Sequence, residues 1–333
     1  MNMTFKYTAL ACFMMGLLAC SCGQKTVNNT SSVAQDYKQV SSDFNSDSAY
    51  HFVDKQVAFG PRVPNSEAHK ACGDYLVAEL ERFGATVTQQ KADLKAFDGT
   101  ILHARNIIGA FNTEKADRIL LFAHWDTRPF SDKDPDEKNY HTPVQGANDG
   151  ASGVGVLLEV ARILKEKAPD LGVDIIFFDA EDYGTPTFVH DIPSGEGWCL
   201  GSEYWSKNPH VPGYKARFGI LLDMVGAPDA TFFKEAISRQ YAQGIVEKVW
   251  GTARDLGYGK YFIDKNVGGI TDDHVPVNEN RGIPSVDIIH LDLNTDSNFG
   301  WYHHTTKDDM NNVSKETLKA VGQTVLEVVY KEK

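Results

Sequence analysis

Hydrophobic and polar positions along the chain fall into blocks with two different periods. Apolar residues recur at helical spacing in some blocks, and they alternate or run continuously in others. The first kind predicts helices at 66–83, 149–167, 235–256 and 314–332, the first and last of which begin with a serine that can cap a helix. The second kind predicts strands at 85–92, 101–111, 117–126, 172–179, 216–223 and 283–290.

Strands and helices alternate along most of the chain, which indicates an α/β fold. We therefore expect a single domain built as a three-layer α/β/α sandwich with a mostly parallel central sheet. The continuously apolar blocks 117–126 and 172–179 are typical of strands buried inside such a sheet. Ligands of these sheets bind beyond the carboxyl ends of the strands, so polar residues that follow strands are candidates for a functional site.

The first 44 residues do not follow this pattern. Lys6 precedes an apolar stretch that is too short for a typical membrane span, which predicts a signal peptide over 1–19. The residues LLAC, 17–20, resemble a bacterial lipobox, in which Cys20 becomes the lipidated first residue. The alternative is an ordinary secretory signal. Residues 20–44 predict a flexible tether, and 45–333 the catalytic domain. We expect an exported, lipid-anchored protein of the bacterial cell envelope, in the periplasm or facing the surface.

Composition narrows the classes of partner. The 333 residues include 33 Lys and Arg against 45 Asp and Glu, which gives a net charge of −12. This balance argues against nucleic acid, whose phosphates require clustered basic side chains. Of the five cysteines, only Cys72 and Cys199 lie in the predicted domain. They could form a disulfide or remain free, and their spacing does not decide between the two.

Acidic residues and histidines follow several of the predicted strands. Each has an ordinary explanation when taken alone; Asp149, for instance, could cap a helix. Together, however, they would repel one another at one edge of the sheet unless a divalent cation bound there. Imidazole nitrogens and carboxylate oxygens suit zinc. The residues concerned are His124, Asp126, Asp149, Glu181, Asp182, Asp223, Asp272, Asp273, His274, His303 and His304.

The adjacent carboxylates Glu181 and Asp182 follow the strand block 172–179 directly. Two such neighbours can divide the chemistry between them. One can bind a metal ion while it stays ionised, and the other can transfer protons with a pKa that its surroundings adjust. The pair therefore predicts a metal site with an acid–base group beside it.

Several stretches resemble the zinc-dependent aminopeptidases and, more closely, the bacterial-type glutaminyl cyclases. They include AHWDTRPF, GANDGASGVGVLLEVARIL, DIIFFDAEDYG, WCLGSEYW, LLDMVGAPDATF, TDDHVPV and HHTTKDD. The resemblance covers residue 45 to the end. It implies a zinc-aminopeptidase-like fold with one zinc ion per chain. It also implies that the N-terminal glutamine of peptides or proteins is cyclised to pyroglutamate with release of ammonia.

The resemblance also implies roles for individual residues. Asp149, Asp182 and His304 match the zinc ligands, and Glu181 matches the proton-shuttling acid and base. Asp223 and Asp272 match two carboxylates that hydrogen-bond behind Glu181, and the expected substrate pocket comprises Trp198, His303, Tyr183 and Asp287.

Three positions depart from the animal enzymes. Asp182 stands where they have Glu, Asp287 where they have His, and His303 where they have an aromatic residue. We interpret these differences as features of the bacterial type. Because two histidines are adjacent, His303 is the alternative ligand to His304.

Two other functions remain open at this point. In a two-zinc aminopeptidase that hydrolyses N-terminal residues, His124 and Asp223 would bind a second ion bridged by Asp149, with Asp126 as a possible further ligand or support. Glu181 would then activate a water molecule. Alternatively, a lipoprotein with a degenerate site could bind peptides without catalysis. We expect a monomer in each case.

Overall fold

The computed structural model describes residues 37–193 and 195–333. Lys38–Lys333 forms one compact unit. The expected signal peptide, the lipidation site Cys20 and most of the expected tether lie outside the described residues. None of the described helices combines the length and the apolar character that crossing a membrane requires.

A six-stranded sheet forms the centre of this unit, in the order β1-β2-β4-β3-β5-β8. Its strands are β1 (Thr86–Lys95), β2 (Ile101–Phe111), β3 (Arg118–His124), β4 (Gly172–Phe178), β5 (Gly219–Asp223) and β8 (Ser285–Ile289). Strand β2 is antiparallel to both of its neighbours, whereas the remaining pairs are parallel. The mostly parallel sheet is thus confirmed. Strands β6 (Phe232–Lys234) and β7 (Phe262–Asn266) form a separate two-stranded sheet.

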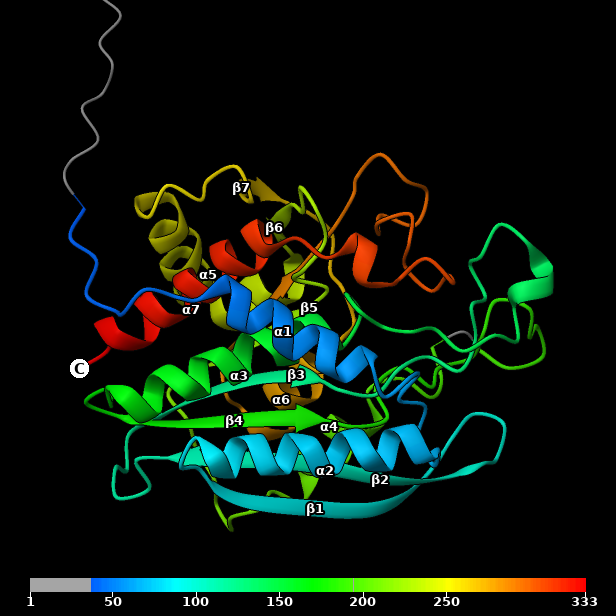
Figure 1. Ribbon diagram of the computed structural model, residues 1–333, viewed down its shortest axis with the longest axis horizontal. Coiled ribbons are helices and arrows are strands. Elements are labelled where there is room, and N and C mark those ends of the chain that lie inside the picture. Colours follow the sequence, from blue (N-terminus) through cyan, green and yellow to red (C-terminus); the bar gives the residue numbers. More distant parts are fainter. Residues whose placement is uncertain (1–36, 194) are drawn as a thin grey trace, which may run out of the picture. The chain divides into compact units, whose positions relative to one another are not determined.

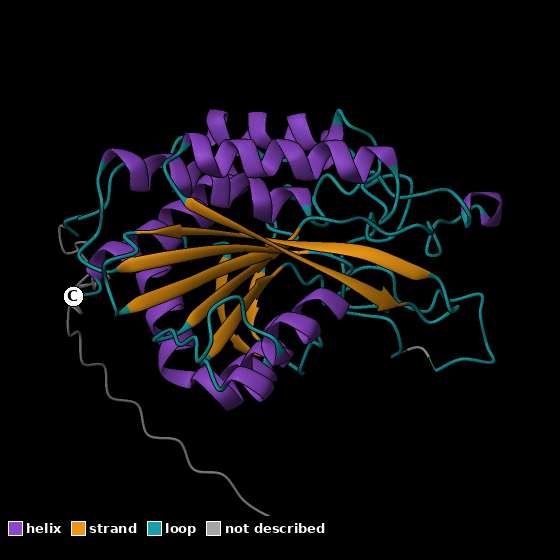
Figure 2. Ribbon diagram, turned by 90° about the horizontal axis from the view of Figure 1, so that it is seen from below, coloured by secondary structure: helices purple, strands orange, loops and turns teal. Residues whose placement is uncertain are grey.

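Helices cover both faces of the central sheet (Figure 2). The longer helices are α1 (Ser46–Val57), α2 (Glu67–Arg82), α3 (Ala151–Glu166), α5 (Ala236–Asp255) and α7 (Lys315–Lys331). The short helices are α4 (Leu200–Lys207), α6 (His274–Arg281) and the 3-10 turns η1 (Glu137–Asn139) and η2 (Met310–Asn312). Helix α1 lies against α3 and α7 rather than on the sheet (Figure 1).

Strand β3 shows how the sheet separates two apolar cores. Leu121 and Ala123 belong to the large cluster that includes the buried residues of α2, α3 and α7. Leu120 and Phe122, which alternate with them, belong to a smaller cluster with Trp205 of α4. Successive side chains of a strand point to opposite faces, so a fully apolar strand requires cover on both. The three-layer arrangement is confirmed.

The predicted strands all form, but several helices were missed. No element was predicted at α1, α4 or α6, and the start of α3 was predicted at Asp149. In the structure Gly150 occupies the cap position, with φ 93° and no side-chain cap bond. A side chain there would approach the carbonyl of Asp126 at 2.8 Å. The carboxylate of Asp149 is therefore not used as a cap.

Residues before the predicted boundary at 45 already pack on the domain. The backbone N–H groups of Val40 and Ser41 donate to the Glu327 carboxylate of α7, and that of Phe44 donates to Gln323. At the other end of the chain, the carbonyl of Lys333 accepts from Arg217. The domain thus begins before residue 45, and the segment that enters it lies on its last helix.

Candidate metal centre

The residues predicted from the strand ends converge at the carboxyl edge of the sheet. Several of them border a cavity of about 290 Å³. Its lining comprises Lys133, Asp149, Glu181, Gly195, Trp198, Asp223, Met224, Ile270, Thr271, Asp272, Ile289, Phe299, His303 and His304. Acidic groups and histidines therefore share a small space with an aromatic and aliphatic wall.

His304 lies close to two carboxylates, Asp149 and Asp182. The Nε2 atom of His304 lies 3.3 Å from Asp182 Oδ1 and 3.6 Å from Asp149 Oδ2. Two ligand atoms that share a tetrahedral zinc ion at about 2.0–2.1 Å are roughly 3.4 Å apart. Asp182 Oδ1 is also buried without a hydrogen-bond partner, as expected for an oxygen reserved for an ion. His304 is thus close enough to share an ion with either carboxylate, whereas the three residues whose ligand atoms all lie within 4.8 Å of one another here are Asp149, His303 and His304.

Protonation of His304 and Asp149 agrees with metal binding, whereas burial and the charge of Asp149 raise the pKa of Asp182 well above its usual value. Burial and the nearby charge of Arg128 hold the pKa of His304 well below its usual value, so its ring is neutral as a ligand must be. Burial acts to raise the pKa of Asp149, but the contact with His124 lowers it overall, so this carboxylate stays ionised. His303 Nε2 lies 3.9 Å from Asp149 Oδ2. It forms an alternative group with Asp149 and His304.

Glu181 stands beside these ligands in the cavity wall. Burial, together with the charges of Asp182 and Asp272, raises its pKa well above the usual value. Among the described residues, the hydrogen-bond partner of its carboxylate is the thiol of Cys199, at 3.4 Å from Oε1, and not Asp223 or Asp272. A partly exposed carboxyl group with a raised pKa is suited to both accepting and returning a proton.

His124 connects two carboxylates at the other side of the cavity. Its Nε2 atom lies 3.0 Å from Asp149 Oδ1 and 3.2 Å from Asp223 Oδ1. Although burial opposes it, the contacts with these carboxylates raise the pKa of His124 well above its usual value. Burial also raises the pKa of Asp223 to about 6. The same three residues could hold a metal ion, as the two-zinc alternative expects.

Two buried carboxylates hold the backbone of the acidic residues in place. Both oxygens of Asp126 accept backbone hydrogen bonds, from the N–H groups of Glu181 and Asp182, at 3.1 Å each. Asp308 accepts in the same way from Asn148 at 2.7 Å and Asp149 at 3.0 Å. Asp126 thus acts as a support. Asp308 was missed, because nothing but its place in the stretch HHTTKDD distinguishes it.

Arg128 is a second residue of the site that was not predicted from the sequence. Its buried guanidinium donates to the carbonyls of Asp182 and Gly184 at 3.2 Å each. It also lies 4.7 Å from the ring of Trp198. That ring in turn stacks on His304, with centroids 5.7 Å apart. Arg128 therefore connects the aromatic wall to the acidic pair.

Two residues predicted for the substrate pocket lie elsewhere. Asp287 is fully buried on β8 and is not in the cavity wall, and both of its oxygens lack a hydrogen-bond partner. Tyr183 packs against Phe97 and Phe130 outside the cavity. The other two predicted pocket residues, Trp198 and His303, do line it. The position of a residue in the sequence does not show whether its side chain lines a cavity or lies in the layer of residues around it.

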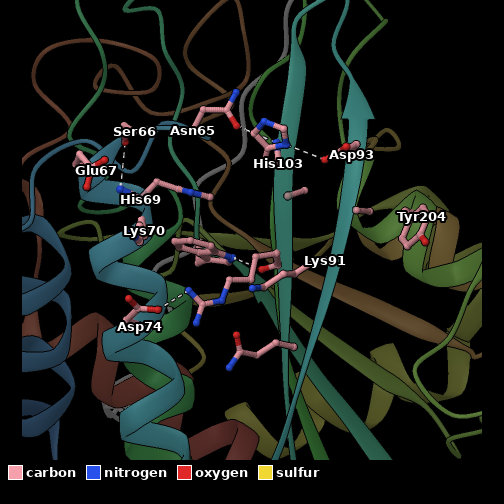
Figure 3. Close-up of a pocket in the computed structure, with 15 residues that line it drawn as sticks. Asn65, Ser66, Glu67, His69, Lys70, Asp74, Lys91, Asp93, His103 and Tyr204 are labelled. Carbon is pink, nitrogen blue, oxygen red and sulfur yellow. Dashed lines mark hydrogen bonds and ion pairs between the residues drawn. The ribbon is translucent and has the colours of Figure 1, made fainter.

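A larger groove of about 900 Å³ lies between α2 and the strands β1 and β2 (Figure 3). None of the predicted site residues lines it. His69 of α2 stacks on Trp125 at 4.2 Å, and its Nε2 atom lies 2.9 Å from the Asp179 carboxylate. Asp179 comes two positions before Glu181. His69 therefore holds Asp179 at the start of the turn that carries Glu181 and Asp182, which we call the acidic turn, and it does so from the side of the groove.

The two cysteines of the domain are both free and buried. Cys72 lies in the apolar core of α2. Cys199 precedes α4 and lies next to Glu181, as described above. Cys72 and Cys199 therefore do not form a disulfide with each other.

Comparison with known proteins identifies relatives over nearly all of the domain. A crystal structure of a Zn-dependent exopeptidase from Parabacteroides distasonis is 62% identical, with a TM-score of 0.86, over 87% of this chain and 99% of that one. A crystal structure of Bacteroides thetaiotaomicron glutaminyl cyclase bound to N-acetylhistamine is 58% identical, with a TM-score of 0.86, over 88% of this chain and 100% of that one. The expected similarity to bacterial glutaminyl cyclases is confirmed.

A curated relative and a family model extend this comparison. The Aminopeptidase YwaD of Bacillus subtilis is 32% identical over 81% of this chain, but the match spans only 54% of that protein. The model of peptidase family M28 matches residues 106–329. This match contains every predicted metal ligand and covers more than half of the chain. The chain therefore belongs to peptidase family M28.

Proposed function

We propose that this chain is a zinc-dependent glutaminyl-peptide cyclotransferase, which converts the N-terminal glutamine of peptides or proteins to pyroglutamate. The observation that carries the proposal is the similarity to the Bacteroides thetaiotaomicron glutaminyl cyclase, at 58% identity over the whole of that chain. The curated aminopeptidase is 32% identical and is matched over about half of its length, whereas the Zn-dependent exopeptidase structure is as similar as the cyclase, at 62% identity. The position of Glu181 beside the metal-binding group is compatible with the proposed reaction.

The reaction is an exchange of one C–N bond for another. The α-amine nitrogen of the substrate attacks its own side-chain carbonyl carbon, a five-membered lactam forms, and ammonia leaves. Glu181 takes a proton from the attacking amine and returns it to the departing nitrogen. A zinc ion held by Asp149, Asp182 and His304 would polarise the carbonyl oxygen as a Lewis acid. Amine and carbonyl already belong to one residue, so the protein mainly has to fold and hold that residue.

The cavity matches a substrate of this size and chemistry. Its volume of about 290 Å³ lies just below the range of typical ligand pockets, which runs from about 300 to 1,000 Å³. It therefore suits one terminal residue rather than an extended peptide. Asp223 and Asp272 in the wall favour a substrate amine. The rings of Trp198 and Phe299 would help to exclude water, which would otherwise hydrolyse the side-chain amide.

The two-zinc aminopeptidase is the second candidate, because His124, Asp149 and Asp223 form a further group that could hold an ion. His124 Nε2 contacts both carboxylates of this group, at 3.0 Å from Asp149 and 3.2 Å from Asp223. Metal analysis of the purified protein distinguishes the two candidates. About one zinc ion per chain agrees with the cyclase, whereas two agree with the peptidase.

The activity itself is tested with glutamine β-naphthylamide as substrate. Ammonia release is followed in a coupled assay, and the product is identified by mass. We expect ammonia and an intact pyroglutamyl naphthylamide. Glu181→Gln should abolish the reaction, whereas Glu114→Gln, at an exposed position between β2 and β3, should not. Release of free naphthylamine with glutamine would instead establish the aminopeptidase.

We further propose that the protein is exported, anchored by a lipid on Cys20, and monomeric. The lipobox-like residues 17–20 support the anchor. Labelling with a fatty acid in a bacterial host should mark the wild type but not Cys20→Ser. The mass of the purified protein in solution, measured by light scattering, should be that of one chain.

A further inference from the structure

Cys199 holds a sulfur atom against the proposed proton shuttle. The residue has a left-handed backbone conformation, φ 56°, at the cap position of α4. Its N–H donates to the carbonyl of Glu181 at 2.9 Å, and its Sγ atom lies 3.4 Å from Glu181 Oε1. Both the start of α4 and the acidic turn therefore fix the position of the thiol.

Asp272 completes a group of three possible ligands. One ligand atom each from Glu181, Cys199 and Asp272 lies within 4.8 Å of the others. Asp272 is 4% exposed, and its Oδ2 atom is buried without a hydrogen-bond partner. Such an oxygen is available to a ligand. Glu181 and Asp272 also line the cavity, which gives an ion access to the group.

The separation of sulfur and oxygen matches that of two ligands on one ion. For bonds of about 2.3 Å to sulfur and 2.0–2.2 Å to oxygen in a tetrahedral arrangement, the two ligand atoms are roughly 3.5 Å apart. The observed distance is 3.4 Å. Because a thiolate selects soft cations, the group favours Cd²⁺ or Zn²⁺ over Ca²⁺ or Mg²⁺.

We propose that Glu181, Cys199 and Asp272 form a second metal site for a thiophilic divalent cation, and that an ion bound there blocks the reaction by occupying Glu181. The site differs from that of the two-zinc alternative, which uses His124, Asp149 and Asp223. On binding, a metal–sulfur bond forms, the S–H bond breaks, and the proton passes to solvent. The inhibitory effect rests on the proposed function, whereas binding of the ion does not.

Cadmium titration of the zinc-loaded full chain tests the site. The background carries serine at positions 12, 20 and 22, so that Cys72 and Cys199 are the remaining thiols. Neither of the other two possible metal groups contains sulfur. The ultraviolet charge-transfer band between thiolate and cadmium therefore reports on a cysteine ligand alone. Activity is measured along the same titration.

We expect the band to saturate at one Cd²⁺ per chain and activity to fall in parallel. Cys199→Ser should remove the band, while Cys72→Ser, which alters a thiol buried in the core, should keep it. Cadmium should inhibit Cys199→Ser at least tenfold more weakly than the background protein. Should Cys199→Ser not fold, Asp272→Asn provides the second test, because it keeps the thiol and should weaken cadmium binding at least tenfold.

An absent band in the background protein, or an equal band in Cys199→Ser, would overturn the proposal. A band that depends on Cys199 in a protein that releases no ammonia would support the metal site and refute only the proposed function. The two proposals therefore fail in distinguishable ways.

Discussion

Asp126 offers the sharpest test of how the acidic pair is held. Its carboxylate is fully buried and accepts the backbone N–H groups of Glu181 and Asp182 at 3.1 Å each. The change Asp126→Asn keeps the shape but leaves one acceptor oxygen, and it turns an amide group toward the second N–H. A hydrogen bond to a charged acceptor contributes about 1.5–3 kcal/mol, and a buried donor left without a partner costs about 1–3 kcal/mol.

These two terms together set an upper limit of about 6 kcal/mol on the loss, and the actual loss is smaller because the turn can relax. We expect the free energy of unfolding of the metal-free protein to fall by about 2–4 kcal/mol. Since the turn carries the ligand Asp182, zinc affinity should also fall, by about 10–100-fold, as is usual when a group behind a metal ligand is changed.

The assay is competition for zinc with a chelator of known affinity, combined with denaturant unfolding of the metal-free protein. Asp98→Asn is the control. It makes the same chemical change in the exposed turn between β1 and β2, where Asp98 accepts a backbone hydrogen bond from Thr100. If Asp126→Asn kept zinc affinity within twofold and its stability unchanged, the two hydrogen bonds would not hold the turn, and the reasoning would be wrong.

Three further predictions concern the same centre. His304→Ala should lose most of its bound zinc on metal analysis, whereas His303→Ala should keep at least half, since His303 lies farther from the other ligands; the reverse result would exchange their roles. Asp308→Asn should weaken zinc binding about 10–100-fold in the chelator assay, because Asp308 positions Asp149, and unchanged binding would contradict this. Burial raises the pKa of Glu181, which must be ionised to accept a proton. The value of kcat/KM should therefore fall as the pH drops through a midpoint above the usual carboxyl value of about 4.3, and a profile flat down to pH 5 would argue against this role.

The sheet was predictable because its strands carry strong patterns. The apolar blocks that became β3 and β4 require cover on both faces, which leaves few alternatives to a three-layer fold. The direction of β2 was not predictable in this way, because an alternating strand has the same pattern in either direction. The eight-residue helices α4 and α6 are too short for a clear helical period, and α6 begins among the acidic residues assigned to the site.

Residues of the site were predictable where a strand end marks them. Glu181 and Asp182 come shortly after the end of β4, and Asp149 comes shortly before the start of α3. Asp308 and Arg128 act through contacts with backbone groups that are distant in sequence; Asp308 is 160 positions from Asn148. Nothing local distinguishes such residues from other loop residues. Only the folded chain reveals them.

The packing of residues 40–44 on α7 also has a geometric consequence. Lys333 lies near Arg118, at the amino end of β3, because Arg217 contacts both residues. The segment around Val40 enters the domain along the last turns of α7, toward this same end (Figure 1). The cavity lies at the opposite end of β3, and seven residues at about 3.3 Å each span roughly 23 Å. The segment 40–44 and the cavity are therefore at opposite ends of the central sheet.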